Sequence, residues 1–234
     1  MSFPTISWDS LQKVSASQME QIFVLATGKY ALDTRVLLEH AARNLSDLAS
    51  ALAPDGPVLV VAGRGHNGGG GLAAARLLAA RGRPVFVVPT HEAENYSGVP
   101  REQLEHLKHY DNVRMRSSLP KMKFACAIDA AIGTSLEGPP RGRTLDVITV
   151  LNNMNGCVIA FDAPTGMNVD DGDIPGAVVN ATVTLSLGLP KTGIQPGASV
   201  GELFVGDLAL PPALYRDAGL EPVKLPGWIT KVSP

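Results

Sequence analysis

The stretch VLVVAGRGHNGGGGLAAARLLAARG, residues 58–82, decides the fold. Five apolar residues run into a segment with six glycines in nine positions, and an alanine- and leucine-rich stretch follows at once. Ordering glycine costs backbone entropy, so folded proteins keep it mainly where the main chain takes a positive φ or approaches another group closely. The pattern predicts a buried strand over 58–63, a tight turn, and a helix from about Asn67 to Arg81 that Gly82 ends.

The rest of the central chain alternates strand and helix patterns. Helices are predicted at 101–110 and 143–154, and apolar strands at 84–89, 113–116, 124–130, 157–163, 181–188 and 201–208. Strands that are apolar on both faces and separated by helices are typical of a mostly parallel sheet covered on both sides. Two helical stretches at 15–30 and 33–52 precede this region, and we expect their apolar stripes to pack on the sheet or on a partner subunit.

Length and composition predict one domain over residues 1–234, with residues 1–14 as an extension and an irregular tail from about residue 221. The net charge of −2 gives no reason to expect nucleic acid or an anionic membrane as a partner. The N-terminus lacks a signal-peptide pattern and no apolar run reaches the length of a membrane span, so we expect a cytoplasmic location. Cys126 and Cys157 lie in apolar runs and are expected to be buried, reduced thiols.

Residues 63–68, GRGHNG, form a GxGxxG motif between a strand and a helix, which is the context that the dinucleotide-binding fingerprint requires. The exposed N–H groups and the positive dipole end of a helix N-terminus favour a phosphate. One interpretation is therefore a nicotinamide-dependent oxidoreductase, although the ribose-binding acid is missing, because the next strand ends in proline and Glu92 is a poor candidate. Another is a tight turn without a ligand, which needs fewer glycines than Gly68 to Gly71 provide.

Three turn-rich loops follow predicted strands, at 63–71, 132–143 and 162–173. The carboxyl ends of parallel strands meet at one edge of a sheet, where ligands of such folds bind. Asp129 and Asp162 each close a buried strand at that edge, and either one alone also fits a cap or turn residue. With Asn67 and Thr165 they form an oxygen-rich set suited to a hard cation or to proton transfer.

Four blocks of this sequence resemble the NAD(P)H-hydrate epimerase family, also called the YjeF N-terminal domain family. The blocks GRGHNGGGG (63–71), IDAAIGTSLEGPPR (128–141), DAPTG (162–166) and GLPKTG (188–193) match its glycine loop and its V-D-A, D-I-P-S-G and G-x-P-K-x-G motifs in order and spacing. VLLEHA (36–41) resembles its N-terminal helix, so the resemblance covers about residues 15–210. It implies a three-layer Rossmann-like α/β/α sandwich with a mostly parallel central sheet and N-terminal helices.

The resemblance also implies an activity, the epimerisation of the R and S forms of hydrated NADH or NADPH. Asp162 is then the general acid–base beside the nicotinamide ring, and Lys191 supplies a charge near it. Asn67, Asp129 and Thr165 are implied ligands of a potassium ion. Implied contacts to the substrate are Asp162 and the loop residues His66, Asn67, Gly68, Gly69, Gly70, Gly71, Gly133, Thr134, Ser135, Leu136, Glu137, Gly138, Pro139 and Arg141, the last as a phosphate clamp.

Three residues of the glycine loop depart from the family pattern. Arg64 replaces a proline, His66 replaces the first asparagine, and Gly70 replaces an aspartate that is expected to meet polar groups of the ligand. Losing one charge-assisted hydrogen bond costs about 1.5–3 kcal/mol, so the sequence predicts weaker substrate binding. A second interpretation follows from this departure, namely a nucleotide-binding or scaffold protein of the same fold with weakened or lost catalysis.

The resemblance further implies the partners of the chain. NAD(P)H hydrate is the expected small-molecule substrate. The kinase-like dehydratase domain that is fused to this domain in some bacterial proteins has no room in 234 residues, so a separate NAD(P)H-hydrate dehydratase is the expected metabolic partner. A homodimer is expected as well, with the apolar helices before residue 54 as its interface.

Overall fold

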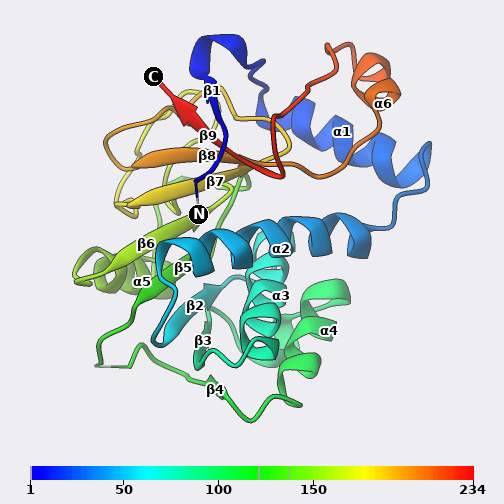
Figure 1. Ribbon diagram of the computed structural model, residues 1–234. Helices are drawn as coiled ribbons and strands as arrows, with labels where there is room; N and C mark the ends of the chain where they lie inside the picture. Colours follow the sequence, from blue (N-terminus) through cyan, green and yellow to red (C-terminus); the bar gives the residue numbers. More distant parts are fainter. Residues whose placement is uncertain (1, 121, 137) are drawn as a thin grey trace.

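The computed structural model describes residues 2–120, 122–136 and 138–234, and these residues form one nine-stranded sheet. The sheet has the order β1-β9-β8-β7-β6-β5-β2-β3-β4, and every neighbouring pair is parallel except β8 and β9 (Figure 1). The strands are β1 (Thr5–Ser7), β2 (Val58–Ala62), β3 (Val85–Pro89), β4 (Val113–Met115), β5 (Cys126–Ala130), β6 (Cys157–Phe161), β7 (Val183–Leu187), β8 (Glu202–Gly206) and β9 (Ile229–Ser233).

Six α-helices connect or precede these strands in the described ranges. They are α1 (Ala16–Gly28), α2 (Thr34–Leu52), α3 (His66–Ala80), α4 (Gly98–Leu107), α5 (Arg143–Asn152) and α6 (Pro212–Asp217), with short 3-10 turns at Trp8–Ser10 and Ala93–Asn95. Ser15 and Gln18 form a capping box that starts α1, and the Asp33 side chain accepts a hydrogen bond from the Arg35 amide at the start of α2. No helix in these ranges is both long enough and apolar enough to cross a membrane.

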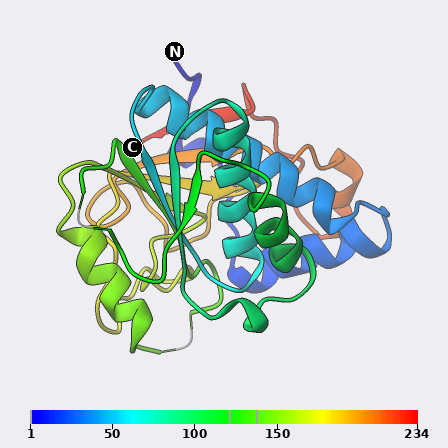
Figure 2. The same cartoon turned by 90° about the horizontal axis from the view of Figure 1, so that it is seen from below.

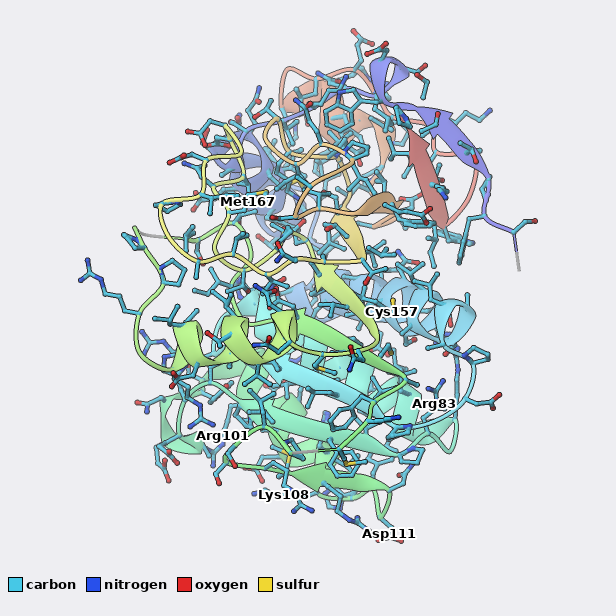
Figure 3. All side chains as sticks on the ribbon, turned by 90° about the vertical axis from the view of Figure 1, so that its left-hand side faces the viewer. Arg83, Arg101, Lys108, Asp111, Cys157 and Met167 are labelled. Carbon is cyan, nitrogen blue, oxygen red and sulfur yellow. The ribbon has the colours of Figure 1, made fainter. Side chains whose placement is uncertain are left out.

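The helices cover the sheet unevenly. Figure 2 shows α2, α3 and α4 together on one face and α5 on the opposite face. On the α5 side, Val147, Ile148 and Leu151 pack in one cluster with Leu59 and Val61 of β2. Beyond the end of α5, long loops cover this face of the sheet. Their residues Met167, Val169 and Ile194 pack with Leu203 and Val205 of β8. Figure 3 views this face, with α5 lying across the strands. The predicted Rossmann-like α/β fold with a mostly parallel central sheet is confirmed.

The strand order sets the position of a ligand crevice. From β2 the chain moves outward to β3 and β4, and it then returns to form β5 on the other side of β2. The order β4-β3-β2-β5-β6-β7 is therefore that of a dinucleotide-binding sheet, with its reversal between β2 and β5. Ligands of such sheets bind outside the carboxyl ends of the strands at that reversal.

The tail from residue 221 is not irregular throughout, so this prediction is wrong for its last part. Residues Ile229–Ser233 form β9, which pairs antiparallel with β8 and parallel with β1. The physical reason is the edge of β8, whose unpaired N–H and C=O groups β9 covers. Thr5–Ser7, expected to belong to an extension, thus becomes the outermost strand of the same sheet.

Candidate functional site

The tetraglycine run lies inside the first turns of α3 and not in the loop before it. The Gly69 amide donates to the Gly65 carbonyl at 2.9 Å, so the amides left free at the N-terminus of α3 are those of His66, Asn67 and Gly68. Gly70 and Gly71 follow within the helix, where each amide donates to the carbonyl four residues earlier. The amides of Gly69, Gly70 and Gly71 are therefore used within the helix, and contacts of these three residues to the substrate stay predictions.

Close packing explains the glycines instead. A Cβ at Gly68 would lie 1.7 Å from the Gly63 carbonyl oxygen, and one at Gly71 would lie 2.5 Å from the Ala130 Cβ of β5. A Cβ at Gly69 would lie 3.1 Å from side-chain atoms of both Leu38 and Pro100. The bare first turns of α3 therefore let it approach the sheet, α2 and α4 at distances that side chains would prevent.

Gly70 faces an aromatic ring of the core. A Cβ at Gly70 would lie 2.3 Å from Cε1 and 2.8 Å from Cζ of Phe161. Phe161 is 1% exposed, belongs to β6 and directly precedes Asp162. In this chain the direction of a side chain at position 70 is filled by the Phe161 ring, and the expected effect of Gly70 on substrate binding stays a prediction.

The turn after β2 lies against the start of the loop after β5. The Gly63 amide donates to the Ala130 carbonyl at 2.9 Å, and a Cβ at Gly63 would lie 2.0 Å from the Ala131 carbonyl oxygen. One turn further along, Asn67 contacts Gly133, whose missing Cβ would lie 3.0 Å from the Asn67 Cγ. Glycine at 63 and 133 is what permits these contacts.

Asn67 brings an unsatisfied polar group to this place. Its side-chain nitrogen Nδ2 is buried and has no hydrogen-bond partner among the described residues. A buried amide left without a partner costs about 1–3 kcal/mol, so such groups in folded proteins usually meet a ligand, an ion or a water molecule. The sequence prediction that Asn67 contacts a ligand is consistent with this orphaned group.

Asp129 is fully buried near the carboxyl end of β5 and accepts hydrogen bonds from neutral donors. The Thr165 amide donates to its Oδ2 at 2.8 Å, and the Thr165 hydroxyl and the Ala131 amide donate to its Oδ1 at 2.7 and 3.3 Å. Burial raises the pKa of Asp129 to about 6, because desolvation outweighs the hydrogen bonds to Thr165 and Ala131 that favour the charged form. A buried carboxylate with neutral partners is a favourable place for a cation.

Thr165 joins the loops that follow β5 and β6. Its hydroxyl accepts a hydrogen bond from the Ile132 amide at 2.9 Å while it donates to Asp129. Its own amide also points to Asp129, so the turn after β6 is held to the end of β5. The structure thus brings Asp129 and Thr165 into direct contact, as the sequence predicts for neighbouring strand ends.

Asp162 and Lys191 form a buried ion pair directly after β6. Asp162 has a positive φ of 68°, a left-handed conformation that aspartate tolerates better than most residues. Lys191 is fully buried, and its Nζ donates to Asp162 Oδ1 and, at 3.2 Å, to the Leu187 carbonyl. The Leu187 amide also donates to Asp162 Oδ1, at 3.1 Å. The hydrogen bonds that the described residues make to this carboxylate fall on Oδ1, which leaves Oδ2 for a ligand.

The loop residues expected to bind substrate differ in their exposure. His66, Thr134, Ser135, Gly138, Pro139 and Arg141 are exposed, Leu136 is half-buried and Gly133 is buried. Glu137 lies outside the described residues. Their contacts to a ligand stay predictions.

Two shallow surface hollows lie away from this edge. One, of about 360 Å³, runs along α2, and the other, of about 390 Å³, lies between α2, α3 and α4. Both are lined mainly by charged and polar side chains, among them Glu39, which pairs with Arg76. Solvated ion pairs of this kind are common on protein surfaces.

Sequence reasoning missed two contributors to the site, Phe161 and the Leu187 amide. Phe161 fills the space beside Gly70, and Leu187 fixes the Asp162 carboxylate. For Phe161 a signal existed, since a large aromatic residue directly precedes Asp162 in the same chain in which Gly70 replaces an aspartate. The Leu187 contact involves a main-chain amide, for which no sequence signal exists.

Comparisons with known proteins complete this description. The family described as YjeF-related protein N-terminus matches residues 34–193. An NAD(P)H-hydrate epimerase of Truepera radiovictrix is 61% identical over 213 residues, which are 91% of this chain and 97% of that protein. A bifunctional NAD(P)H-hydrate repair enzyme Nnr of Thermofilum pendens is 33% identical over 218 residues, covering 86% of this chain and 42% of that protein. The crystal structure of the yeast protein ynu0, YNL200c, has a TM-score of 0.82 at 24% identity, covers 94% of this chain and all of its own, and shows the same fold.

Proposed function

The chain belongs to the family of YjeF-related protein N-termini, and on that premise we propose that it interconverts the R and S forms of hydrated NADH and NADPH. Family membership confirms the resemblance of the four motif blocks. A relative named NAD(P)H-hydrate epimerase that is 61% identical over 91% of this chain supports the activity. The observation that carries the proposal is the Asp162–Lys191 pair at the end of β6, because epimerisation needs a group that gives and retakes a proton.

The chemistry assigned to Asp162 follows from the substrate. Carbon 6 of the hydrated nicotinamide ring bears a hydroxyl and is bonded to the ring nitrogen. When the Asp162 carboxylate takes up a proton and passes it to the hydroxyl, water leaves and the nitrogen lone pair forms an iminium. Water then adds to the opposite face of carbon 6 and returns a proton to Asp162, so that the configuration is inverted and the proton count is unchanged. A carboxyl group in this role contributes about 10²- to 10⁴-fold to the rate.

Lys191 acts in this proposal as the residue that holds the acid. Its Nζ and the Leu187 amide both donate to Asp162 Oδ1, so the carboxylate cannot rotate freely and Oδ2 keeps one direction. The side chain of Asp162 is 12% exposed, whereas that of Lys191 is fully buried. The carboxylate is therefore the member of the pair that a ligand in the crevice can reach.

We further propose that a potassium ion binds between Asn67, Asp129 and Thr165. Asp129 is buried among neutral donors, and the side chain of Asn67 carries an amide oxygen beside its unsatisfied nitrogen. Oxygen atoms of this kind suit a hard cation. A bound ion would neutralise the Asp129 charge and tie the start of α3 to the loops after β5 and β6.

The activity is tested with a single purified epimer of NADPH hydrate, whose conversion to the other epimer is followed by chromatography. The wild-type protein is expected to equilibrate the two forms, and Asp162→Asn to lower the rate by at least about 100-fold. Asp173→Asn is the matched control, because Asp173 is an exposed aspartate of the same loop region. A wild-type protein that leaves the pure epimer unchanged beyond its spontaneous rate would refute the proposed function.

The departures of the glycine loop from the family pattern at Arg64, His66 and Gly70 leave a second candidate, a protein of this fold that binds the nucleotide but no longer catalyses epimerisation. Calorimetry with NADP separates binding from turnover. Tight binding without epimer conversion would favour this second candidate, whereas conversion at a rate far above the spontaneous one would exclude it.

A homodimer and a dehydratase partner are further parts of the proposal. Val24 of α1 is 63% exposed and Val36 of α2 is 46% exposed, and a dimer interface that covers these helices would remove their apolar surface from water. Light scattering of the wild type and of Val24→Glu tests this interface, and we expect the variant to be monomeric. The chain covers 42% of the bifunctional repair enzyme, whose name implies a second activity in the rest of that protein. A separate dehydratase would supply that activity to this chain.

A further inference from the structure

Basic side chains gather at the carboxyl ends of β2 and β3, beside the glycine turn. Ala62 at the end of β2 is the register partner of Pro89 at the end of β3, so the two strands leave the sheet side by side (Figure 1). Arg64 lies two residues beyond the first strand and His91 two residues beyond the second. Both side chains are exposed at this edge.

His91 is held at this edge by its neighbour Thr90. The Thr90 amide donates to the Ala62 carbonyl of β2 at 2.9 Å, which ties the exit of β3 to that of β2. The Thr90 hydroxyl forms a 2.8 Å hydrogen bond with His91 Nδ1. The other ring nitrogen, Nε2, is left for a ligand.

Arg143 reaches the same edge from the opposite face of the sheet. It is the first residue of α5, and its guanidinium donates to the Ser117 carbonyl, just beyond β4, at 2.6 Å. Partial desolvation, Arg64 and Arg143 lower the pKa of His91, which means that both guanidinium groups lie within electrostatic range of the ring. Arg64, His91 and Arg143, here called the basic cluster, therefore share one region.

The basic cluster has no partner carboxylate among the described residues. Other arginines of this protein pair with a carboxylate, since Arg35 pairs with Glu102 and Arg81 pairs with Asp47. Glu92 and Glu94 follow β3 in exposed positions, and the ion pairs of the described residues include neither of them. The two guanidinium groups of Arg64 and Arg143, without a counter-charge among the described residues, create a positive potential that attracts an anion.

The place of the cluster in the sheet identifies the anion. In sheets with this strand order the adenosine ribose of a dinucleotide lies at the end of the strand that follows the glycine turn, where an acid selects the free 2′-hydroxyl and an arginine accommodates a 2′-phosphate. We propose that Arg64, His91 and Arg143 bind the 2′-phosphate of the substrate, so that hydrated NADPH is preferred over hydrated NADH. This inference rests on the proposed function, since it concerns the other end of the same substrate.

The first test compares kcat/KM for the two hydrates in the wild type, Arg64→Gln and Arg143→Gln. Each variant is expected to lose about tenfold or more on NADPH hydrate and to stay within about twofold on NADH hydrate, because only one substrate carries the 2′-phosphate. Arg216→Gln is the control, as Arg216 is an exposed arginine of α6 far along the chain from the crevice loops. An equal loss on both hydrates, or no loss on either, would overturn the proposal.

The second test needs no turnover and separates this inference from the proposed function. Calorimetry compares 2′,5′-ADP with 5′-AMP, which differ only in the 2′-phosphate. The wild type is expected to bind 2′,5′-ADP at least about tenfold more tightly, and the two arginine variants to lose that difference. Equal affinity for the two nucleotides, or binding of neither, overturns the inference. A protein that shows the preference but converts neither hydrate contradicts the epimerase proposal and leaves the phosphate site supported.

Discussion

Phe161 occupies the space that a side chain at position 70 would need, since a Cβ at Gly70 would lie 2.3 Å from the ring carbon Cε1. The two residues lie on α3 and β6, and the ring is 1% exposed. An aspartate at 70 would therefore face the aromatic core beside β6, and the loss of that aspartate does not open a gap at the crevice. Gly70 and Phe161 are best understood as a matched pair that packs α3 onto the strand carrying Asp162.

This pairing predicts non-additive stabilities. Gly70→Ala is expected to cost about 1–3 kcal/mol through overpacking, and Phe161→Val to cost about 2–4 kcal/mol through the cavity it leaves. The loss of unfolding free energy in the double variant is expected to be smaller than the sum of the two single losses by at least about 1 kcal/mol, because the new methyl group enters that cavity. Urea denaturation measures all three free energies of unfolding.

A control for the alanine substitution is available in α1. A Cβ at Gly28 would meet nothing within 4 Å, so Gly28→Ala is expected to leave stability unchanged or to raise it slightly. Additive effects of Gly70→Ala and Phe161→Val would contradict the packing relationship.

Asp129 predicts a dependence of stability on pH. Its pKa is raised from 3.8 to about 6 in the folded protein, so the folded state binds the proton more tightly than the unfolded state. The stability that this proton confers is complete below about pH 4 and is lost as the pH rises through about 6, by roughly 3 kcal/mol in total. Asp129→Asn removes this titration, so the variant is expected to lose less stability than the wild type between pH 5 and about pH 8.

The same residue supplies a test of the cation. At about pH 8, where Asp129 is charged, potassium chloride is expected to raise the melting temperature of the wild type above that in choline chloride of equal ionic strength. Asp129→Asn should show no such difference. An equal response of both proteins to the two salts would argue against a potassium site at Asp129.

Lys191 predicts a large loss of stability when its charge is removed. Lys191→Met leaves the Asp162 carboxylate without its buried partner. The loss of unfolding free energy is expected to be about 3–5 kcal/mol, toward the lower end of this range because the Asp162 side chain is slightly exposed. Lys231→Met is the matched control, since the exposed Lys231–Glu202 pair at 2.7 Å is expected to contribute less than about 1 kcal/mol. Denaturant midpoints compare the two variants, and similar losses would contradict a buried pair at 191.

Most of the parallel sheet could be predicted because its strands are buried on both faces and appear as continuous apolar runs, as in VLVVA of β2 and CAIDA of β5. β9 could not, because ITKVS follows Pro222 and Pro226, and its pairing with β8 depends on a contact distant in sequence. The contact of Asp129 with Thr165 follows from neighbouring strand ends. The contacts of Gly69 with Leu38 and Pro100 depend on how three helices pack, which a local pattern does not contain.

The hydrogen bonds of Thr165 predict that the site requires its hydroxyl and not its methyl group. The hydroxyl bridges Asp129 and the Ile132 amide at 2.7 and 2.9 Å, whereas the methyl group takes part in neither hydrogen bond. Thr165→Ser keeps the hydroxyl and is expected to retain activity within about threefold and stability within about 1 kcal/mol. Thr165→Val has nearly the same shape but removes the hydroxyl donor of Asp129 Oδ1, which keeps only the Ala131 amide at 3.3 Å, and it removes the acceptor of the half-buried Ile132 amide. These losses are expected to cost about 1–3 kcal/mol. Its loss should be greatest above about pH 6, where Asp129 is charged and depends most on its donors. Urea denaturation at pH 5 and about pH 8 measures this, and a valine variant as stable as the serine variant at both values would show that the hydroxyl does not hold the two loops together.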